Sequence, residues 1–438
     1  MFMRRHVMLA LLSAGFMVGG TAGPVKAETL VIPETPAIPE ASPLAQVLAA
    51  VQKESPSSGL QRAAPKPAAA PPVVESPPAV AAPPSVAVEA PPVYAPPAAP
   101  IIAASGERPI FQFLPLLPSA ADLEASPALW PLLGSQNLGA PHDAVTRAVI
   151  IIHNADRDAE AGLTRLQKLA GAVASGPDAR TLILAPLFPT GAELPAFKSA
   201  LGAVARNLAV WSADNWAYGG DSIVTEPQRP ISSMLALDIL LLYLADQKSF
   251  PSLRNVVIAG AGSGGDLVQR YALYGRAPDI LAEQKLALRF VVAGAQSYAY
   301  MTEARPRADA AGFAPPSEAA LKECAAYQDY PYGLEAPNTY AQQTSADSVR
   351  QNYPTRDVVY LYGAQDTQPA LDQNCAAKLL GSSVKARAEN YERYLQSLFP
   401  DARGQRFAAL PGVNGGDKIW GSTCGVSVLF ADGDCVKN

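Results

Sequence analysis

Histidine is scarce in this chain, which has three in 438 residues, and charged residues make up only 17% of the total. The three are His6, His142 and His153, so the sequence beyond residue 153 contains no imidazole. The formal net charge is −5, and no block of Lys and Arg indicates a footprint for nucleic acid or acidic lipid. We therefore expect no nucleic-acid partner, and histidine chemistry is restricted to the first part of the sequence.

Cysteine is also rare, with four residues in total. They are Cys324, Cys375, Cys424 and Cys435. No CxxC or CxxH spacing occurs among them, so the sequence does not indicate a zinc site, and we expect no metal or other cofactor. An even number of cysteines in an exported chain instead predicts two disulfide bonds.

One short apolar stretch lies at the N-terminus, where Arg4 and Arg5 precede residues 8–20 and a small-residue cleavage motif ends at Ala27. This pattern is typical of a secretory signal peptide over 1–27. The alternative is a membrane anchor, but such a stretch is too short to cross about 30 Å of hydrocarbon as a helix. We expect a mature chain without a membrane span, exported to the periplasm or the extracellular space.

Aromatic residues are nearly absent from residues 31–100, where Tyr94 is the only one and 18 of the 42 prolines occur. Because proline fixes φ and removes a backbone donor, we expect residues 28–105 to form a disordered Pro/Ala-rich spacer of extended polyproline II type. Ser42-Pro43 begins a short helical pattern inside this spacer. It is interpreted either as a docking helix for a partner or as a marginal helix in a linker.

The remainder of the chain, 106–438, alternates short strand-like runs with longer helical patterns. The expected strands are 147–152, 181–186, 255–260, 288–293, 357–362 and 406–411. The expected helices are 156–174, 229–248, 264–274, 371–380, 386–399 and 417–430. Most of the strand candidates are continuous runs rich in Val and Ile, as in strands buried on both faces. The alternation predicts an α/β fold, with helices on both faces of a mostly parallel central sheet.

The most informative motif is a glycine-rich turn that contains Gly260, Gly262, Gly264 and Gly265. It follows a strand candidate and precedes a helix candidate, which is the context of a nucleophile elbow, G-x-S-x-G. The alternative is a dinucleotide-binding loop, because Gly260, Gly262 and Gly265 match G-x-G-x-x-G. That motif is weak by itself, and no acidic residue closes a following strand at the required distance.

Together with several other patches, this turn resembles the secreted α/β-hydrolase-fold proteins of bacteria and fungi, which are esterase- or lipase-like. The resemblance covers roughly residues 145–432 and implies the α/β-hydrolase fold. The matching patches are 152–159, 231–233 with Asp238, the elbow with 268–272, Arg305-Pro306, Cys324 with 332–334, 362–367, Cys375 and 411–413. The resemblance also implies a disulfide between Cys324 and Cys375, which leaves Cys424 and Cys435 to pair by elimination.

The chain departs from this family where the catalytic residues belong. Similar family members read G-H-S-A-G-G at the elbow, which places Gly262 at the nucleophile position. The acid position corresponds to Asp366, just after a strand candidate, and is intact. Near the C-terminus the family reads P-G-V-G-H-D, which places Gly416 at the position of the base. The resemblance therefore implies a degenerate member that lacks both the nucleophile and the catalytic histidine.

Chain order supports the same conclusion without the resemblance. In α/β-hydrolases the triad runs Ser, then Asp or Glu, then His, and no histidine follows the elbow here. A shift by one residue offers Ser263 as the nucleophile, although we interpret this serine as the N-cap of the following helix. His153 and Asn154 are candidates for the oxyanion loop. His153 is also a candidate for an out-of-order base, although we interpret it as a hydrogen-bonded loop residue.

The sequence thus predicts an exported, catalytically inactive α/β-hydrolase-fold protein. Its role would be to bind an envelope protein, a glycan or a small ligand, or to serve envelope assembly through its spacer. Two alternatives remain open. One is an active serine esterase that uses Ser263 with a non-standard base, and the other is a scaffold whose useful part is the Pro/Ala segment.

Overall fold

The computed structural model describes residues 101–102, 110–116, 127–173, 180–223, 230–307, 312–431, 433 and 435. The predicted signal peptide, most of the predicted spacer and the helical pattern that begins at Ser42 lie outside the described residues. Ile101–Ile102, which composition placed in the spacer, form the short strand β1 and pair with Phe113 and Gln112. The sheet therefore begins within the last residues of the predicted spacer.

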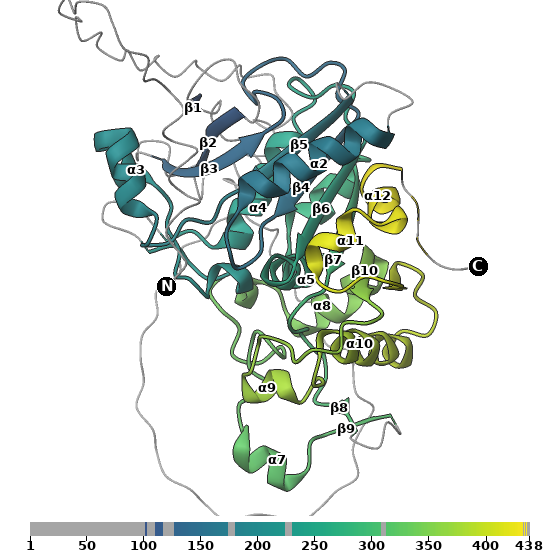
Figure 1. Ribbon diagram of the computed structural model, residues 1–438. Coiled ribbons are helices and arrows are strands. Elements are labelled where there is room, and N and C mark those ends of the chain that lie inside the picture. The colour runs from purple at the N-terminus through teal and green to yellow at the C-terminus, as the bar shows by residue number, and fades with distance from the viewer. Residues whose placement is uncertain are drawn as a thin grey trace, which may run out of the picture. The chain divides into compact units, whose positions relative to one another are not determined.

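A nine-stranded sheet organises the described residues, with the order β1-β2-β3-β5-β4-β6-β7-β10-β11 (Figure 1). Its strands are β1 (Ile101–Ile102), β2 (Ile110–Leu116), β3 (Ala128–Gly134), β4 (Arg147–Ile152), β5 (Thr181–Pro186), β6 (Asn255–Ala261), β7 (Ala287–Ala293), β10 (Asp357–Gly363) and β11 (Gln405–Leu410). From β5 to β11 all neighbours are parallel, whereas β1, β2 and β3 add antiparallel pairs at one edge. The predicted mostly parallel sheet is confirmed.

Strands β2 and β3 were not predicted from the sequence, and a proline in each explains why. Pro115 and Pro131 lie inside these strands, and proline is disfavoured within a sheet because it has no amide hydrogen to donate. The carbonyl of Pro131 still accepts the Leu187 amide at 2.9 Å, and β3 pairs with β5 through Leu132–Gly134. Tertiary pairing therefore outweighs the local preference.

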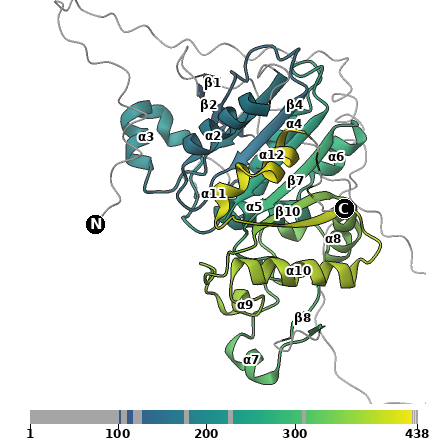
Figure 2. The ribbon, with the colours of Figure 1, turned by 45° about the vertical axis from the view of Figure 1, so that its right-hand side comes forward.

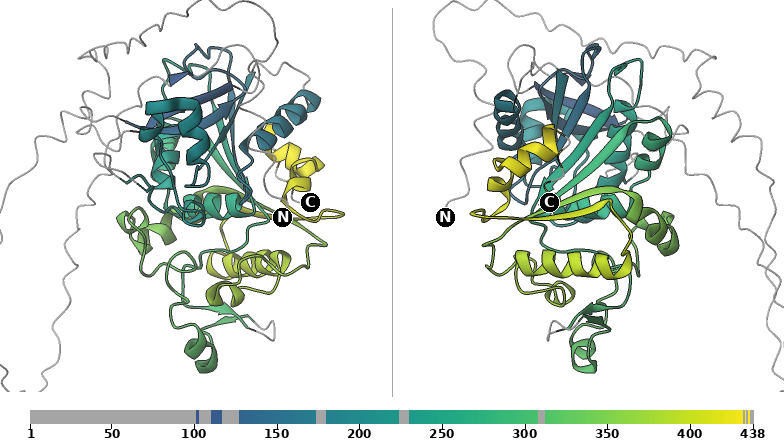
Figure 3. Two further views of the ribbon diagram at one scale, coloured as in Figure 1. Left: turned by 60° about the vertical axis from the view of Figure 1, so that its left-hand side comes forward. Right: turned by 90° about the vertical axis from the view of Figure 1, so that its right-hand side faces the viewer.

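Helices cover both faces of the sheet and pack in two cores. The first core contains residues of α4 (Ser233–Leu244), α5 (Ser263–Tyr274) and α10 (Val384–Leu398), and the second contains residues of α2 (Ala159–Val173), α11 (Gly416–Trp420) and α12 (Thr423–Phe430). In β6, Val256 and Ile258 belong to the first core, whereas Val257 and Ala259 belong to the second. This alternation is that of a strand buried on both faces. Figures 2 and 3 show α2, α11 and α12 together over one face.

The predicted helices differ from the observed ones mainly at their ends. The helix predicted over 229–248 is α4, which is shorter at both ends. It starts after Ser232, whose hydroxyl accepts the Met234 amide at 3.1 Å, and nearly all of it is buried. The single helix predicted over 417–430 is broken in two, because the hydroxyl of Ser422 accepts the Gly425 amide at 2.9 Å and starts α12. No helix among the described residues is long and apolar enough to cross a membrane.

The segment that connects β7 to β10 carries most of the remaining short elements. It contains β8 (Arg305–Pro306), β9 (Phe313–Ala314), α7 (Glu318–Glu323), the 3-10 turns Ala341–Gln343 and Tyr353–Thr355, and α8 (Ala346–Asn352). Elsewhere lie α3 (Leu194–Leu201), the 3-10 turns η3 (Gly202–Asn207) and η4 (Trp216–Tyr218), α6 (Ala277–Glu283) and α9 (Cys375–Lys378). Figure 1 shows α7, β8 and β9 below α10, away from β1 to β3.

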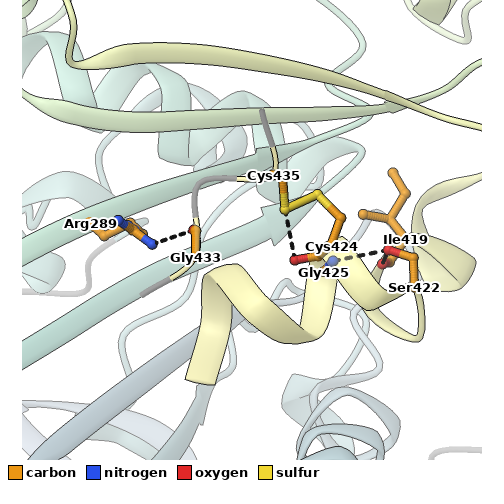
Figure 4. The surroundings of a disulfide bond; sticks show 7 residues. All are labelled: Arg289, Ile419, Ser422, Cys424, Gly425, Gly433 and Cys435. Atoms are coloured by element: carbon orange, nitrogen blue, oxygen red, sulfur yellow. Dashed lines mark hydrogen bonds between the residues drawn. A yellow bond between two sulfur atoms is a disulfide. The ribbon is translucent and has the colours of Figure 1, made fainter. Parts of the chain in front are cut away.

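Both predicted disulfides are confirmed. Cys324 bonds to Cys375 across 51 residues, and Cys424 bonds to Cys435 across 11. The first ties the end of α7 to the start of α9, and the second ties α12 to the C-terminal segment, whose Gly433 carbonyl accepts a bond from Arg289 at 2.9 Å (Figure 4). Both bonds hold segments outside the central sheet.

Candidate functional site

The carboxyl ends of the parallel strands meet at one edge of the sheet. The pairing of Ile152 with Gly260, and of Gly363 with Leu410, brings β4 level with β6 and β10 level with β11. The loops that follow these strands therefore lie along the same edge. These loops, with the first residues of the helices α5 and α11 that follow two of them, carry the candidate residues taken from the sequence: His153, Asn154, Gly262, Ser263, Asp366 and Gly416.

Gly262 forms the apex of a tight turn between the last residue of β6 and the first residue of α5. Its φ of 55° and ψ of −121° place it in a conformation that favours glycine. A Cβ on Gly260 would lie 2.3 Å from the Gly264 carbonyl oxygen, and a Cβ on Gly264 would lie 2.5 Å from the His153 carbonyl oxygen. The flanking glycines are thus required by close backbone approach, as in a nucleophile elbow with residue 262 at its apex.

Ser263 is the first residue of α5 and not its N-cap, so the capping role expected from the sequence is wrong. The N-cap is Gly262, which has no side chain to offer, and the helix begins without a side-chain cap. The tight turn decides this outcome, because it places the elbow residue itself at the cap position. The Ser263 side chain is partly exposed.

The Asn154 side chain lies directly against the elbow. Its Oδ1 atom accepts the backbone amide of Ser263 at 3.0 Å. A Cβ on Gly262 would lie only 2.3 Å from the same oxygen. In an active enzyme of this fold, the amide after the nucleophile stabilises the oxyanion. Here that amide is already bonded to a side chain of the loop after β4.

His153 is buried, and both of its ring nitrogens have backbone partners. Nε2 accepts the Phe188 amide at 3.1 Å, so the ring hydrogen is on Nδ1, which donates to the Asn154 carbonyl at 2.8 Å. The imidazole also packs against the Trp216 ring, with 4.5 Å between centroids. Burial, with a smaller contribution from the charge of Arg157, lowers the pKa of His153 to about 4. The ring is therefore neutral at physiological pH, and neither nitrogen is free to accept a proton from a nucleophile.

His142 lies at the opposite edge of the sheet. It precedes β4, whereas the elbow follows β6, and these two strands are parallel. The ring is buried and stacks on Phe250 with 4.6 Å between centroids. Its position gives it no access to the elbow.

The structure brings the loops of the acid and base positions together. Asp366 follows β10, is half-buried, and its amide bonds to the Gly363 carbonyl at 3.1 Å. The neighbouring Gln365 side chain accepts the Gly412 amide at 2.7 Å, which links this loop to the loop after β11. Gly416 follows in the same loop, as the first residue of α11. A glycine there supplies no side chain for a proton transfer.

Sequence reasoning missed a buried ion pair one turn into α5. Asp266 and Arg270 are almost completely buried, and the Asp266 Oδ1 lies 3.6 Å from the Arg270 Nη1. Burial raises the pKa of Asp266 to about 6, while the nearby charge of Arg270 opposes that rise. Arg270 also donates to the Ser297 carbonyl at 2.7 Å and to the Pro331 carbonyl, so it joins the elbow helix to the segment after β7. Acidic and basic residues four apart in a buried helix are the signal that identifies such a pair.

A metal centre is not indicated at this edge. Among the described residues, no group of three or more His, Cys, Asp and Glu side chains is arranged to hold an ion. The chemistry available there includes backbone amides, the carboxylate of Asp366, the hydroxyl of Ser263 and exposed carboxamides.

Strand order and elbow together assign the fold. The elbow follows β6 in the middle of the sheet, the acid position follows β10, and the loop after β4 faces the elbow amide. This is the arrangement of the α/β-hydrolase fold, as predicted from the sequence.

Comparison with known proteins finds similar folds among solved structures. No protein-family model matches the chain, and no curated protein sequence matches it. The chain is similar to poly(aspartic acid) hydrolase-1 from Sphingomonas sp. KT-1, at 18% identity and a TM-score of 0.43, over 68% of this chain and 91% of that one. It is also similar to the siderophore hydrolase EstB from Aspergillus nidulans, at 11% identity and a TM-score of 0.37, over 77% and 99% of the two chains. The fold assignment rests on the strand order and the elbow of the chain itself.

Proposed function

We propose that this chain is an exported α/β-hydrolase-fold protein that hydrolyses no esters and acts by binding. Its ligand is an envelope protein, a glycan or a small molecule, held at the carboxyl edge of the parallel strands. The observation that carries the proposal is Gly262, which has the backbone conformation of the elbow apex and no side chain to act as a nucleophile.

Acyl transfer on this fold needs a nucleophile and a base that accepts its proton. Ser263 has a hydroxyl next to the apex, but it lies on the first turn of α5. His153 holds both ring nitrogens in backbone bonds, and His142 lies at the other edge of the sheet. A hydroxyl without a base is a weak nucleophile, so the geometry favours binding over catalysis.

The exposed side chains at this edge are suited to a polar ligand with one apolar group. Asn154, Gln365 and Asn414 are exposed on the loops after β4, β10 and β11. Their carboxamide oxygens already accept bonds from Ser263, Gly412 and Lys418, and their amide nitrogens are donors that a ligand can use. Leu371 is 80% exposed on the loop after β10 and supplies apolar surface. These loops project from a rigid sheet, which is the usual placement of binding residues.

Export is part of the proposal. The two disulfides support it, because such bonds form and persist in oxidising compartments. The signal-peptide pattern over 1–27 supports it as well. Expression of the full chain, followed by N-terminal sequencing of the mature protein, tests it, and we expect the mature chain to begin at Glu28.

Purified mature protein is expected to show no serine-dependent esterase activity. Its turnover of a short acyl ester such as p-nitrophenyl acetate should equal that of the Ser263→Ala variant, because Ser263 has no base. An active-site serine probe should label neither chain. Wild-type turnover in the ordinary enzyme range of ~1–10³ s⁻¹ that disappears in Ser263→Ala contradicts the proposal and makes Ser263 the nucleophile.

A capture experiment distinguishes binding at the folded part from the alternative in which the Pro/Ala segment is the useful part. Mature protein and a chain that lacks residues 28–100, and therefore keeps β1, are used as baits against an envelope extract and a glycan array. A ligand retained by both chains supports binding at the folded part, and its loss on substitution of Leu371 and Gln365 by Ala places it at the proposed edge. A ligand captured only when residues 28–100 are present favours the scaffold instead.

A further inference from the structure

The Asn154 carboxamide occupies two places that an active elbow keeps free. The first is the oxyanion position, because the Ser263 amide donates to Asn154 Oδ1 at 3.0 Å. The second is the space of the nucleophile side chain. A Cβ on Gly262 would meet three atoms of the same carboxamide, with Oδ1 at 2.3 Å, Cγ at 2.9 Å and Nδ2 at 3.2 Å. Real Cβ atoms essentially never approach another heavy atom closer than 3.0 Å.

The backbone that presents this carboxamide is fixed from both sides. The Asn154 carbonyl accepts the His153 Nδ1 hydrogen at 2.8 Å and the Arg157 amide at 2.9 Å. His153 is itself held by the Phe188 amide, and its carbonyl lies so close to Gly264 that a Cβ there would be 2.5 Å away. The side chain therefore projects from an ordered loop and not from a free one, although its outer surface is exposed.

We propose that Asn154 is an internal ligand of the elbow, which closes the oxyanion position to a substrate carbonyl and has to be displaced by any side chain placed at residue 262. This inference rests on the proposed function, since it names the contact that keeps the old catalytic position shut. Positions 154 and 262 form a coupled pair. A side chain at 262 must expel the carboxamide, and an external oxygen that is to accept the Ser263 amide must displace Asn154 Oδ1.

A double-mutant cycle in the mature chain tests the pair. The four chains are wild type, Asn154→Ala, Gly262→Ser and the double variant, and thermal unfolding midpoints are measured. Asn154→Ala alone should lower the midpoint, because it removes the bond to the Ser263 amide. In the Gly262→Ser chain the same change should raise the midpoint by about 3 °C or more, because it removes all three clashing atoms. The strain of a positive φ at residue 262 is common to both serine chains and cancels.

A control and a second measurement complete the test. Asn414→Ala removes a carboxamide that bonds Lys418 and not the elbow, so it should shift the midpoints of wild type and Gly262→Ser equally. Hydrogen exchange of the Ser263 amide should accelerate about tenfold in Asn154→Ala and stay unchanged in Asn414→Ala. This measurement needs no folded Gly262→Ser chain.

Two results overturn the inference. One is a cycle in which Asn154→Ala lowers both midpoints by the same amount, and the other is an unchanged exchange rate at Ser263. Neither the unfolding midpoints nor the exchange rate of the Ser263 amide reports on catalysis. An active wild-type chain would refute the proposed function, and it would not change the result of the double-mutant cycle. If the effects of Asn154→Ala and Gly262→Ser on the unfolding midpoint simply add, the role of Asn154 is refuted, and the result of the esterase assay is not affected.

Discussion

Restoring a serine and a histidine at the lost positions is expected to produce an esterase only when Asn154 is truncated as well. The chain with Asn154→Ala, Gly262→Ser and Gly416→His should hydrolyse a short acyl ester at least ~10²-fold faster than wild type, as judged by kcat/KM. The chain with only Gly262→Ser and Gly416→His should remain at the wild-type rate. The reason is that the carboxamide lies 2.3 Å from the position of a Cβ on residue 262 and also holds the Ser263 amide.

The restored chain offers its own control at the acid position. Adding Asp366→Asn to it should remove the gain, because the new histidine then loses the carboxylate that orients its ring. A gain that survives Asp366→Asn shows that this aspartate does not serve the rebuilt base. Equal gains with and without Asn154→Ala show that the carboxamide moves aside without cost, which contradicts its role as an internal ligand.

Acidification from pH 6.5 to pH 4 is expected to lower the free energy of unfolding by about 3 kcal/mol through His153 alone. The unfolded imidazole binds its proton with a pKa near 6.5, whereas burial lowers the pKa of His153 to about 4 in the fold. Between these values the unfolded chain binds more protons, so protonation favours unfolding. The stabilisation is complete above pH 6.5 and is lost as the pH falls through the window.

Urea unfolding at a series of pH values, for wild type and His153→Gln, measures this contribution. Glutamine does not titrate, and its side-chain oxygen is able to accept the Phe188 amide in place of Nε2. The free energy of unfolding of wild type, relative to that of His153→Gln, should therefore decrease as the pH falls from 6.5 to 4. The pKa of Asp266 is raised, so this residue favours the folded state at low pH, but it does so in both chains and cancels. Parallel curves for the two chains would show that His153 does not carry the effect.

The parallel strands were predictable because their signal is local. Runs such as 147–152 and 181–186 are continuous and rich in Ile, Leu and Val, and the observed strands coincide with them. Strands β2 and β3 were not predictable in the same way. Each contains a proline, and it is their pairing with each other and with β5 that makes them strands.

The prediction that Ser263 is the N-cap of α5 was wrong for a related reason. A serine between glycines at the start of a helical pattern is the common signature of an N-cap. The nucleophile-elbow turn moves the cap to Gly262, which adopts a positive φ that serine disfavours. The helix start is thus set by the strand-to-helix connection, which residue preferences alone do not describe.

The sequence by itself determined which residues are missing from the candidate site. Glycine stands at 262 and 416, and no histidine follows residue 153, so residue identity and chain order predict a chain without a serine triad. Only the tertiary structure decided what fills the vacated place. The bond from Ser263 to Asn154 joins residues 109 positions apart and exists because β4 and β6 pair in parallel with their ends level. Such a contact depends on the register of two strands, and no local pattern in the sequence encodes it.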